Sequence, residues 1–449
     1  MRTLIQNGLL VDPANRVQAP LNLLVEDGTV AAVTRERPQA DEVIDAAGMI
    51  VAPGFVDLHM HEDPVGGDGA IETSIFNFML RMGVTTAVGG NCGMNEHEPG
   101  DYLDIVDRDG APVNVALLAG QAYFRQKAGA TDKYRPATPG QRREEARGLA
   151  ESLDRGCLGV SYGIRYSPGI DQAELEETAA VCRKQDKLIA AHIRDDAEAV
   201  FGALKELLDA GRELGLPVEV SHIGSMAGFG QMARFLAMVD EYRMNGLRVD
   251  CDCYPYYAFS THLGSTPYDD GWMDRYGCGY DVVELCEGKY KGRRCTKEIF
   301  DEVRRDHPDC ITVCHVMKPG DVDLALGHPS VMLASDGILN RGQGHPRAAG
   351  AFPRLIAQFV RTGKLTLHEA VAMMTSMPAE KLELKRKGRL NAGADADIVV
   401  FDLEKIQDRA TFSAPTLAPE GITHVLIGGR IAMKDGRVAE DRLGRSVRK

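Results

Sequence analysis

Short apolar segments alternate with longer amphipathic segments through the middle of this chain. Each apolar segment has the length of a strand buried on both faces, and the residues between two such segments leave room for a helix. This alternation is typical of repeated βα units and a parallel sheet. We expect eight strands, at residues 54–59, 84–89, 113–118, 158–162, 188–192, 218–222, 248–254 and 331–336. They predict an α/β fold that closes into a (β/α)8 TIM-like barrel.

Two connections between these strands differ in kind. In residues 138–156, apolar positions recur at helical spacing, Thr138 is a suitable N-cap, Pro139 suits the first turn and Gly156 suits the end. A helix is predicted there. The connection before the last strand, at about 260–330, is out of proportion and rich in Gly, Tyr and Cys. Long connections of this kind often cover active sites, so a lid-like insertion is expected.

Both ends of the chain show short strands separated by polar turns instead. Near the start, the Asp27-Gly28 pair is a hairpin signal between two apolar runs. A similar strand pattern returns at residues 397–401 and 424–429. We therefore predict that residues 1–53 and 386–449 meet in a small β-sandwich domain, and that residues 54–385 form the barrel.

Composition narrows the range of partners and compartments. The formal net charge of −13 argues against binding a phosphate backbone, which requires a basic patch. No apolar run has the length of a membrane span, and the first residues do not read as a secretory signal, so we expect a cytoplasmic protein that binds neither nucleic acid nor membrane. Ten cysteines in such a chain indicate reduced thiols, one or two of which carry chemistry.

Potential metal ligands stand at the carboxyl ends of the predicted strands, where barrels of this type carry their reactive groups. A single histidine in such a place is usually a structural residue, but six ligand-type residues coincide here. They are His59, His61, Cys92, His192, His222 and Asp336. Nitrogen, sulfur and oxygen donors of this kind suit zinc. For Cys92, a small buried thiol is the competing interpretation, and the pattern alone leaves it open.

Several segments carry a family resemblance. Residues 51–61 (VAPGFVDLHMH) and 388–402 (GRLNAGADADIVVFD) resemble the amidohydrolase superfamily. Within it, Gly83-Val84-Thr85-Thr86 leading to Gly90-Asn91-Cys92-Gly93, the Ser221-His222 pair, residues 252–256 (DCYPY), and Ser335-Asp336-Gly337 leading to His345-Pro346-Arg347 resemble the N-acyl-D-amino-acid deacylases, or D-aminoacylases. The resemblance runs through nearly the whole chain and includes the long insertion.

The resemblance implies a tightly bound zinc ion on Cys92, His192 and His222. It implies a second, weaker site on His59, His61 and Asp336, with Cys92 able to bridge. Related cyclic amidases bridge their metals with a carboxylated lysine, but the predicted strands 113–118 and 158–162 contain no lysine. This absence favours the deacylase branch.

The implied reaction is hydrolysis of the amide bond of an N-acyl-D-amino acid, a small molecule that bears a carboxylate. Asp336 is the candidate base, which takes a proton from water and hands it to the departing amine. Tyr166 matches the family position that stabilises the oxyanion, although a loop aromatic is an equal alternative. Arg347, with Tyr254 and Ser260, matches the carboxylate-binding position; a surface ion pair is the competing interpretation of Arg347.

Three other functions stay open. A cyclic amidase of the hydantoinase or dihydroorotase kind shares the barrel and the paired histidines, a deaminase shares the superfamily, and a non-catalytic scaffold shares the fold. The family often has His or Lys directly after the sixth-strand histidine, where this chain has Ile223-Gly224. This departure leaves the side-chain preference open. Homo-oligomers are common for such barrels, so a homo-oligomer is possible.

Overall fold

The computed structural model describes all 449 residues and confirms the eight parallel strands. In chain order these are β8 (Phe55–Asp57), β9 (Val84–Gly89), β10 (Asn114–Leu117), β12 (Gly159–Gly163), β13 (Leu188–His192), β14 (Val218–Val220), β15 (Val249–Cys253) and β19 (Val331–Leu333). Neighbouring strands pair in parallel. The short strand β11 (Ala119–Gly120) follows β10 in the chain and forms the parallel pairing with β12. The ring closes where the His61 N–H donates to Gly337 O (2.9 Å) and the Asp336 N–H donates to His59 O (2.8 Å).

Three of these strands end at least two residues before their predicted ends. Strands β14 and β19 end at Val220 and Leu333, before His222 and Asp336, and both of these residues have a positive φ that extended backbone excludes. Strand β8 ends at Asp57, two residues before His59. His59, His222 and Asp336 therefore lie just beyond their strands, whereas His192 is the last residue of β13.

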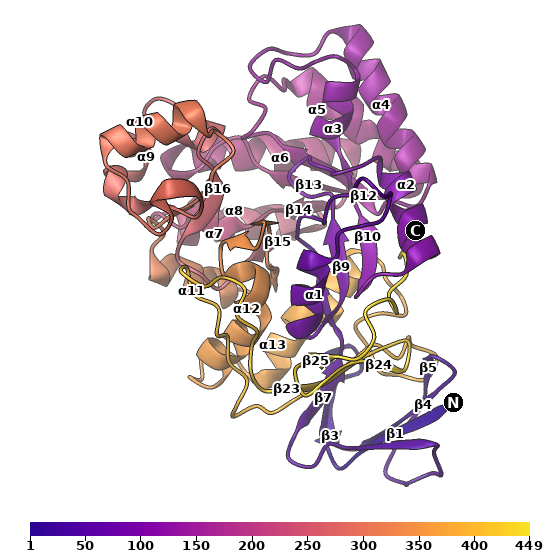
Figure 1. The fold of residues 1–449 in the computed structure, drawn as a ribbon. Helices are drawn as coiled ribbons and strands as arrows, with labels where there is room; N and C mark the ends of the chain where they lie inside the picture. The colour runs from indigo at the N-terminus through magenta and orange to yellow at the C-terminus, as the bar shows by residue number, and fades with distance from the viewer.

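Helices surround the ring of strands (Figure 1). The helix predicted at 138–156 is confirmed as α4 (Pro139–Asp154), with a capping box between Thr138 and Gln141. The other helices of the barrel layer are α1 (Ser74–Arg81), α2 (Pro99–Asp109), α3 (Gln121–Lys127), α5 (Gln172–Ala179), α6 (Val200–Leu214), α7 (Ile223–Ala227), α8 (Met232–Met244), α11 (Pro319–Leu326), α12 (Arg347–Leu355), α13 (Leu367–Met374) and α14 (Ser376–Lys381).

The two ends of the chain build two further sheets, at the bottom of Figure 1. One sheet has the order β5-β4-β1-β6, with β1 (Arg2–Gln6), β4 (Asn22–Glu26), β5 (Thr29–Thr34) and β6 (Glu42–Asp45). The other has the order β25-β24-β23-β22-β7-β2-β3, with β2 (Leu9–Asp12), β3 (Val17–Pro20), β7 (Ile50–Pro53), β22 (Ile398–Phe401), β23 (Ile422–Ile427), β24 (Arg430–Lys434) and β25 (Arg437–Val438). A core separate from that of the barrel joins them, and includes Ile5, Val25 and Leu426. Segments distant in sequence thus share one core.

The last residues of the chain leave these sheets and return to the barrel. Gly444 and Ser446 form bridges with Ala111 and Val115. The buried Lys187 ammonium donates to the carbonyl oxygen of Lys449 (2.8 Å). In Figure 1 the C-terminus lies beside α2, far from the terminal sheets.

The long connection before β19 holds a small antiparallel sheet of its own. Its order is β16-β18-β17, with β16 (Phe259–His262), β17 (Val283–Leu285) and β18 (Ile311–Cys314). Helices α9 (Trp272–Tyr276) and α10 (Lys297–Asp306) project with it from one side of the barrel (Figure 1). An aromatic cluster of Tyr268, Trp272, Tyr280 and Phe300 packs this unit together.

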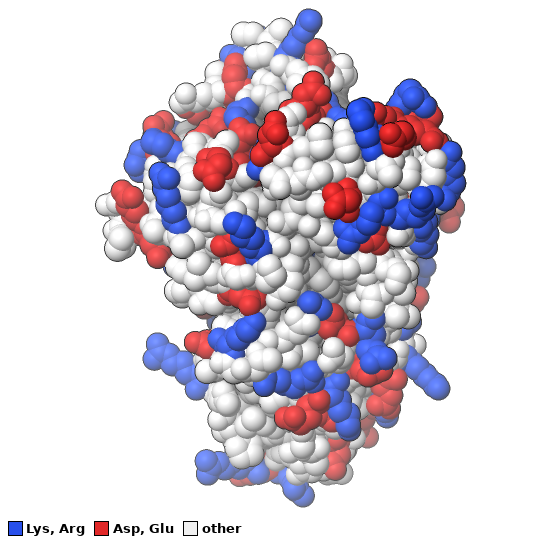
Figure 2. All heavy atoms as spheres, turned by 90° about the vertical axis from the view of Figure 1, so that its left-hand side faces the viewer, with Lys and Arg blue, Asp and Glu red and all other residues white.

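The surface on this side of the molecule carries charges of both signs. Lys and Arg are interspersed with Asp and Glu, and a largely uncharged area crosses the middle of the face (Figure 2). No helix of the structure combines the length and apolar character that crossing a membrane requires.

Candidate metal centre

The loop after β9 presents Cys92 through an unusual run of backbone angles. Gly90 and Gly93 have φ of +74° and +76°, and Cys92 itself has φ of +53°. A Cβ atom on Gly90 would collide with the carbonyl oxygen of Leu118, so only glycine fits there. The buried Glu62 carboxylate accepts the Gly90 N–H (2.6 Å). The loop is thereby fixed with the Cys92 thiol in the barrel mouth.

His222 and Asp336 are also held in left-handed conformations, with φ of +34° and +47°. Non-glycine residues visit this region rarely and at a cost in free energy. Both backbones are held by buried partners: the His222 N–H donates to Asp252 Oδ1 (2.9 Å), and the Asp336 N–H donates to His59 O (2.8 Å). The surrounding barrel therefore imposes the conformation that turns both side chains inward.

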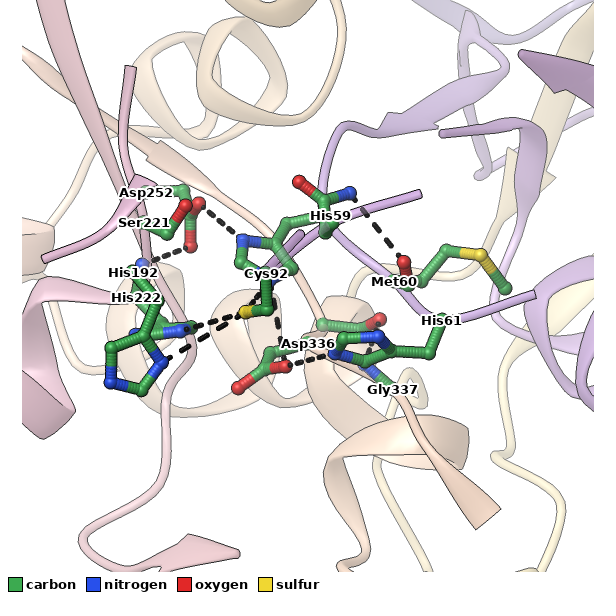
Figure 3. A network of polar contacts seen from close by, with 12 residues as sticks. His59, Met60, His61, Cys92, His192, Ser221, His222, Asp252, Asp336 and Gly337 are labelled. Atoms are coloured by element: carbon green, nitrogen blue, oxygen red, sulfur yellow. Dashed lines mark hydrogen bonds and ion pairs between the residues drawn. The ribbon is translucent and has the colours of Figure 1, made fainter. Parts of the chain in front are cut away.

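The six candidate ligands meet in one cluster (Figure 3). Cys92 Sγ lies 3.4 Å from His222 Nε2, 3.9 Å from His192 Nδ1 and 3.6 Å from His59 Nε2. Asp336 Oδ1 lies 3.3 Å from His61 Nε2 and 3.6 Å from His59 Nε2. The structure thus brings every predicted ligand to the same place, with Cys92 between the two groups.

These distances and donor types fit zinc. Tetrahedral ligands at usual zinc–sulfur and zinc–nitrogen distances lie about 3.5 Å apart, close to the spacings around Cys92 Sγ. Burial lowers the pKa of His59 to about 4 and of His222 to about 3, so both imidazoles are neutral and have a free lone pair. Burial raises the pKa of the Cys92 thiol, so a cation is needed to stabilise its thiolate.

Two residues that the sequence did not single out orient the ligand rings. Asp252 Oδ2 lies 2.8 Å from His59 Nδ1, which leaves His59 Nε2 to face the cluster. The Ser225 hydroxyl lies 3.0 Å from His222 Nδ1 in the same way. Such partners set the tautomer and orientation of metal-binding histidines. The signal for Asp252 was an acidic residue inside an otherwise buried strand, β15.

Comparison with known proteins places this cluster in a family. A profile of the amidohydrolase family matches residues 310–433. The N-acyl-D-glutamate deacylase of Alcaligenes xylosoxydans xylosoxydans is 33% identical, over 95% of this chain and 92% of that protein. The D-aminoacylase of the same organism is 32% identical, over 95% and 93%.

The chain belongs to the N-acyl-D-amino-acid deacylase family of amidohydrolases.

Solved structures of this family superpose over the whole chain. The N-acyl-D-glutamate deacylase of Bordetella bronchiseptica, complexed with zinc and a phosphonate mimic of the tetrahedral intermediate, has a TM-score of 0.89 at 30% identity and covers 100% of this chain and 99% of its own. A D-aminoacylase described by its binuclear metal centre gives 0.89 at 26%, with the same coverage. A D-hydantoinase, at 0.66 and 18%, shares the barrel fold.

The residues predicted to bind substrate lie beside the cluster. Arg347, at the start of α12, is 2% exposed; its Nη1 lies 2.9 Å from Asp336 Oδ2 and its guanidinium lies over the Tyr254 ring, 4.6 Å from the centroid. Arg347 is therefore not a surface ion pair. The Tyr166 ring packs edge-on against His192, with centroids 4.6 Å apart, and the Ser260 hydroxyl donates to Thr312 O (2.8 Å). All four line cavities at the barrel mouth.

Asp336 is ionised at neutral pH in this environment. Burial raises its pKa, but the positive charge of Arg347 and the hydrogen bond from His61 outweigh that effect and hold the pKa well below its usual range. An ionised carboxylate at this position is able to accept a proton. Arg347 thus lowers the pKa of Asp336, the candidate base, and also lines the cavity beside it.

Other cavity residues were not predicted, and most come from the insertion. Phe259, Thr261, Pro267 and Tyr276 line the cavity beside His192 and His222, together with Asp196 from the loop after β13. Their positions depend on the fold of the insertion, which carries no sequence pattern that points to the barrel. The cysteines of residues 251–314 belong to none of the potential metal-binding groups, which agrees with their interpretation as ordinary thiols.

Proposed function

We propose that this protein is a zinc-dependent hydrolase that cleaves the amide bond of N-acyl-D-amino acids, releasing a carboxylic acid and a D-amino acid. The observation that carries the proposal is the placement of Arg347 beside the ligand cluster. The buried Arg347 guanidinium lies beside the ligand cluster of neutral imidazoles, a thiol and a carboxylate. Together these groups line the cavity at the barrel mouth. A substrate that bears both a carboxylate and an amide fits this pairing, and the family relationship supports the choice.

Cys92, His192 and His222 would hold a tightly bound zinc ion. His59, His61 and Asp336 would hold a second, weaker one, with Cys92 shared because its Sγ lies 3.6 Å from His59 Nε2. When bound, zinc supplies Lewis acidity, which lowers the pKa of water and polarises an amide carbonyl.

Asp336 is proposed as the group that moves the proton. Its carboxylate accepts a proton from the attacking water as the water oxygen bonds to the carbonyl carbon. It then delivers that proton to the amide nitrogen, so that the C–N bond breaks and a neutral amine departs. One carboxylate serves both steps because proton uptake and release occur on the same face of the amide.

Tyr166 is proposed to stabilise the oxyanion that develops on the amide carbonyl oxygen, and Arg347 is proposed to bind the substrate α-carboxylate. Tyr166 contacts His192 and lines the cavity, which supports a role for its hydroxyl as a donor to the developing oxyanion. Arg347 Nε is buried and has no hydrogen-bond partner, so it is free to donate to the substrate α-carboxylate. Tyr254, under the guanidinium, and Ser260 complete the carboxylate site.

Amine release from matched pairs of N-acetyl D- and L-amino acids tests this function, with hydantoins and dihydroorotate alongside. Zinc-loaded protein is expected to cleave the D-amides selectively. Arg347→Lys, which keeps the charge but loses the planar fork, should raise KM for the amides. Ring opening without amide cleavage would replace the proposal with a cyclic amidase, and no turnover by zinc-loaded, folded protein would favour a scaffold.

We also propose the division of the chain into a β-sandwich domain of residues 1–53 and 386–449, whose last residues return to the barrel, and a barrel of residues 54–385. The separate core of the terminal sheets supports it. The lid-like role of residues 260–330 is proposed on the cavity-lining residues of that insertion. The partner proposed is a small carboxylate-bearing substrate; a homo-oligomer and a cytoplasmic location stay expectations.

A further inference from the structure

The side chain of the amino acid that this site accepts is open, because relatives of nearly equal identity are named for different substrates: an N-acyl-D-glutamate deacylase, a D-aminoacylase and an N-acyl-D-aspartate deacylase. An acidic side chain presents a second carboxylate beyond the α-carboxylate. Whether the site provides a cation for this second carboxylate depends on the residues that line the cavity.

The cavity around the ligand cluster has two lobes that share the walls formed by Tyr166, Ser260, Thr261, Asp336 and Arg347. The first lobe lies towards His192 and His222. Its remaining walls are Asp196, Ser225, Met226, Tyr254, Phe259, Pro267 and Tyr276. The second lobe lies towards His61 and Cys92. Its remaining walls are Met94, His262, Ser265, Ile311 and Ile338.

Neither lobe contains a lysine or arginine other than the shared Arg347. One guanidinium serves the substrate α-carboxylate and already pairs with Asp336 at 2.9 Å. The imidazole of His262, in the second lobe, is mostly buried, and burial lowers its pKa, so it adds no positive charge at neutral pH. A side-chain carboxylate would therefore lose its hydration in either lobe without gaining a cation.

The first lobe carries a negative charge of its own, on Asp196. This carboxylate is 2% exposed and accepts a hydrogen bond from the Tyr276 hydroxyl (2.7 Å). The nearby guanidiniums of Arg165 and Arg275 lie 3.9 Å and 3.6 Å from it and line neither lobe. Arg165 also pairs with Asp195 at 2.9 Å. Asp196 thus lines the first lobe, whereas neither of its two arginine neighbours does.

The helix that follows His222 adds no cation either. Its residues Ile223–Ala227 (IGSMA) are buried and uncharged, and Met226 is the long side chain that it turns into the first lobe. Met94, Ile311 and Ile338 give the second lobe an apolar wall in the same way. Apolar contact is thus available in both lobes, whichever one receives the side chain.

We propose that this site selects N-acyl-D-amino acids with uncharged side chains and discriminates against N-acyl-D-glutamate and N-acyl-D-aspartate. The inference rests on the proposed deacylase function. The charges of the cavity walls then select a substrate class that sequence identity leaves undecided.

The test is a comparison of kcat/KM across N-acetyl derivatives of D-leucine, D-methionine and D-phenylalanine against those of D-glutamate and D-aspartate. The uncharged group is expected to exceed the acidic group by about 10–100-fold, because an unpaired carboxylate is costly to bury. Equal or greater turnover of the acidic group overturns the proposal, and Arg165 would then be the first cation to examine. Failure to cleave any D-amide instead overturns the proposed function.

Two matched substitutions locate the lobe that receives the side chain. Met226→Lys and Met94→Lys each place an ammonium in one lobe, and one of them is expected to raise the ratio of D-glutamate to D-leucine turnover by about tenfold or more. Met244→Lys, at a surface position that is 82% exposed, is the matched control and should leave the ratio unchanged. If the buried Met226→Lys variant does not fold, Asp196→Asn serves for the first lobe. An unchanged ratio in folded variants of both lobes contradicts the charge-based selection.

Discussion

Non-glycine residues with left-handed backbone angles occur in several parts of this molecule, and those in the terminal sheets differ from those among the proposed metal ligands at the rim of the barrel. In the terminal sheets these are Asn7, Arg16, Asp27 and Asp435, with φ of 66°, 54°, 48° and 48°. Three of the four are short polar residues, Asn or Asp, in turns beside strands, which is where such residues tolerate this conformation best. There the unusual angles reverse the chain and serve the fold.

Among the proposed metal ligands at the rim, Cys92, His222 and Asp336 have such angles, with φ of 53°, 34° and 47°. All three are buried, and all three are proposed metal ligands. None sits in a hairpin turn, and each carries a polar group away from water. Residues held in sparsely populated conformations cluster at functional sites, where the surrounding fold compensates for the cost. Changes at the rim should therefore affect metal binding and turnover, and changes in the terminal sheets should affect only stability.

The largest effect is expected from Cys92→Ala. Cys92 lies between both groups of ligands, so its loss should release the tightly bound zinc and abolish measurable turnover. Zinc content by inductively coupled plasma mass spectrometry and amide turnover are the readouts. Cys182→Ala, which removes another buried thiol outside the cluster, is the control and should retain both. Full zinc content in the Cys92 variant would remove Cys92 as a ligand.

Asp336→Asn should separate metal binding from proton transfer. The amide cannot serve as a base, so turnover should fall by about 10²–10⁴-fold, while zinc stays on Cys92, His192 and His222. Paired measurements of kcat and zinc content per chain check this expectation. Turnover close to that of the unsubstituted enzyme would exclude Asp336 as the proton carrier.

A buried carboxylate outside the rim should affect stability alone. Burial and the negative charge of Glu174 raise the pKa of Glu145 to about 7, so the folded state favours its protonated form. The unfolded chain ionises at lower pH, and Glu145 therefore costs stability as pH rises from about 4.5 to 7.

Glu145→Gln removes this cost and keeps an oxygen to accept the Gln121 amide, now 2.8 Å away. The variant should gain about 1–3 kcal/mol over the parent at pH 8 and much less at pH 4. Chemical denaturation at both pH values measures the difference. A gain that is the same at both would show that Glu145 ionises normally.

The smallest effect is expected in the terminal sheets. Gly28 follows Asp27 in the two-residue turn between β4 and β5 and has φ of +83°. A Cβ atom there meets nothing closer than 3.4 Å, so Gly28→Ala should cost only the backbone strain of about 1 kcal/mol. Thermal unfolding should show the loss, and kcat and KM should not change. A clear loss of turnover would mean that the two regions are coupled.

The sequence predicted the barrel because buried strands and amphipathic helices differ in period along the chain. Its eight strands, and the ligand candidates at or just beyond the ends of five of them, were accessible from local pattern. The left-handed angles at His222 and Asp336 were not, since they depend on hydrogen bonds to Asp252 and His59, which are far away in sequence. The Arg347–Asp336 contact was missed for a similar reason: the resemblance assigned each residue a separate role.

The internal fold of the insertion is the part of the structure that the sequence pattern did not predict. Strands β16, β17 and β18 are only three or four residues long, and β18 pairs with β16 across about fifty residues and with β17 across about thirty, so no periodic signal reveals their sheet. The cavity residues Phe259 and Tyr276 depend on that sheet and its helices. Residues proposed to affect substrate selection therefore lie in the segment with the least periodic pattern of apolar and polar positions.

Anomalous X-ray diffraction from crystals of the purified enzyme, at energies above and below the zinc absorption edge, tests the metal centre most directly. The structure predicts a zinc peak within bonding distance of Cys92 Sγ, His192 Nδ1 and His222 Nε2, and a weaker peak, if the second site is filled, near His59, His61 and Asp336. A turnover-competent crystal preparation with no anomalous peak in this cluster would contradict the account.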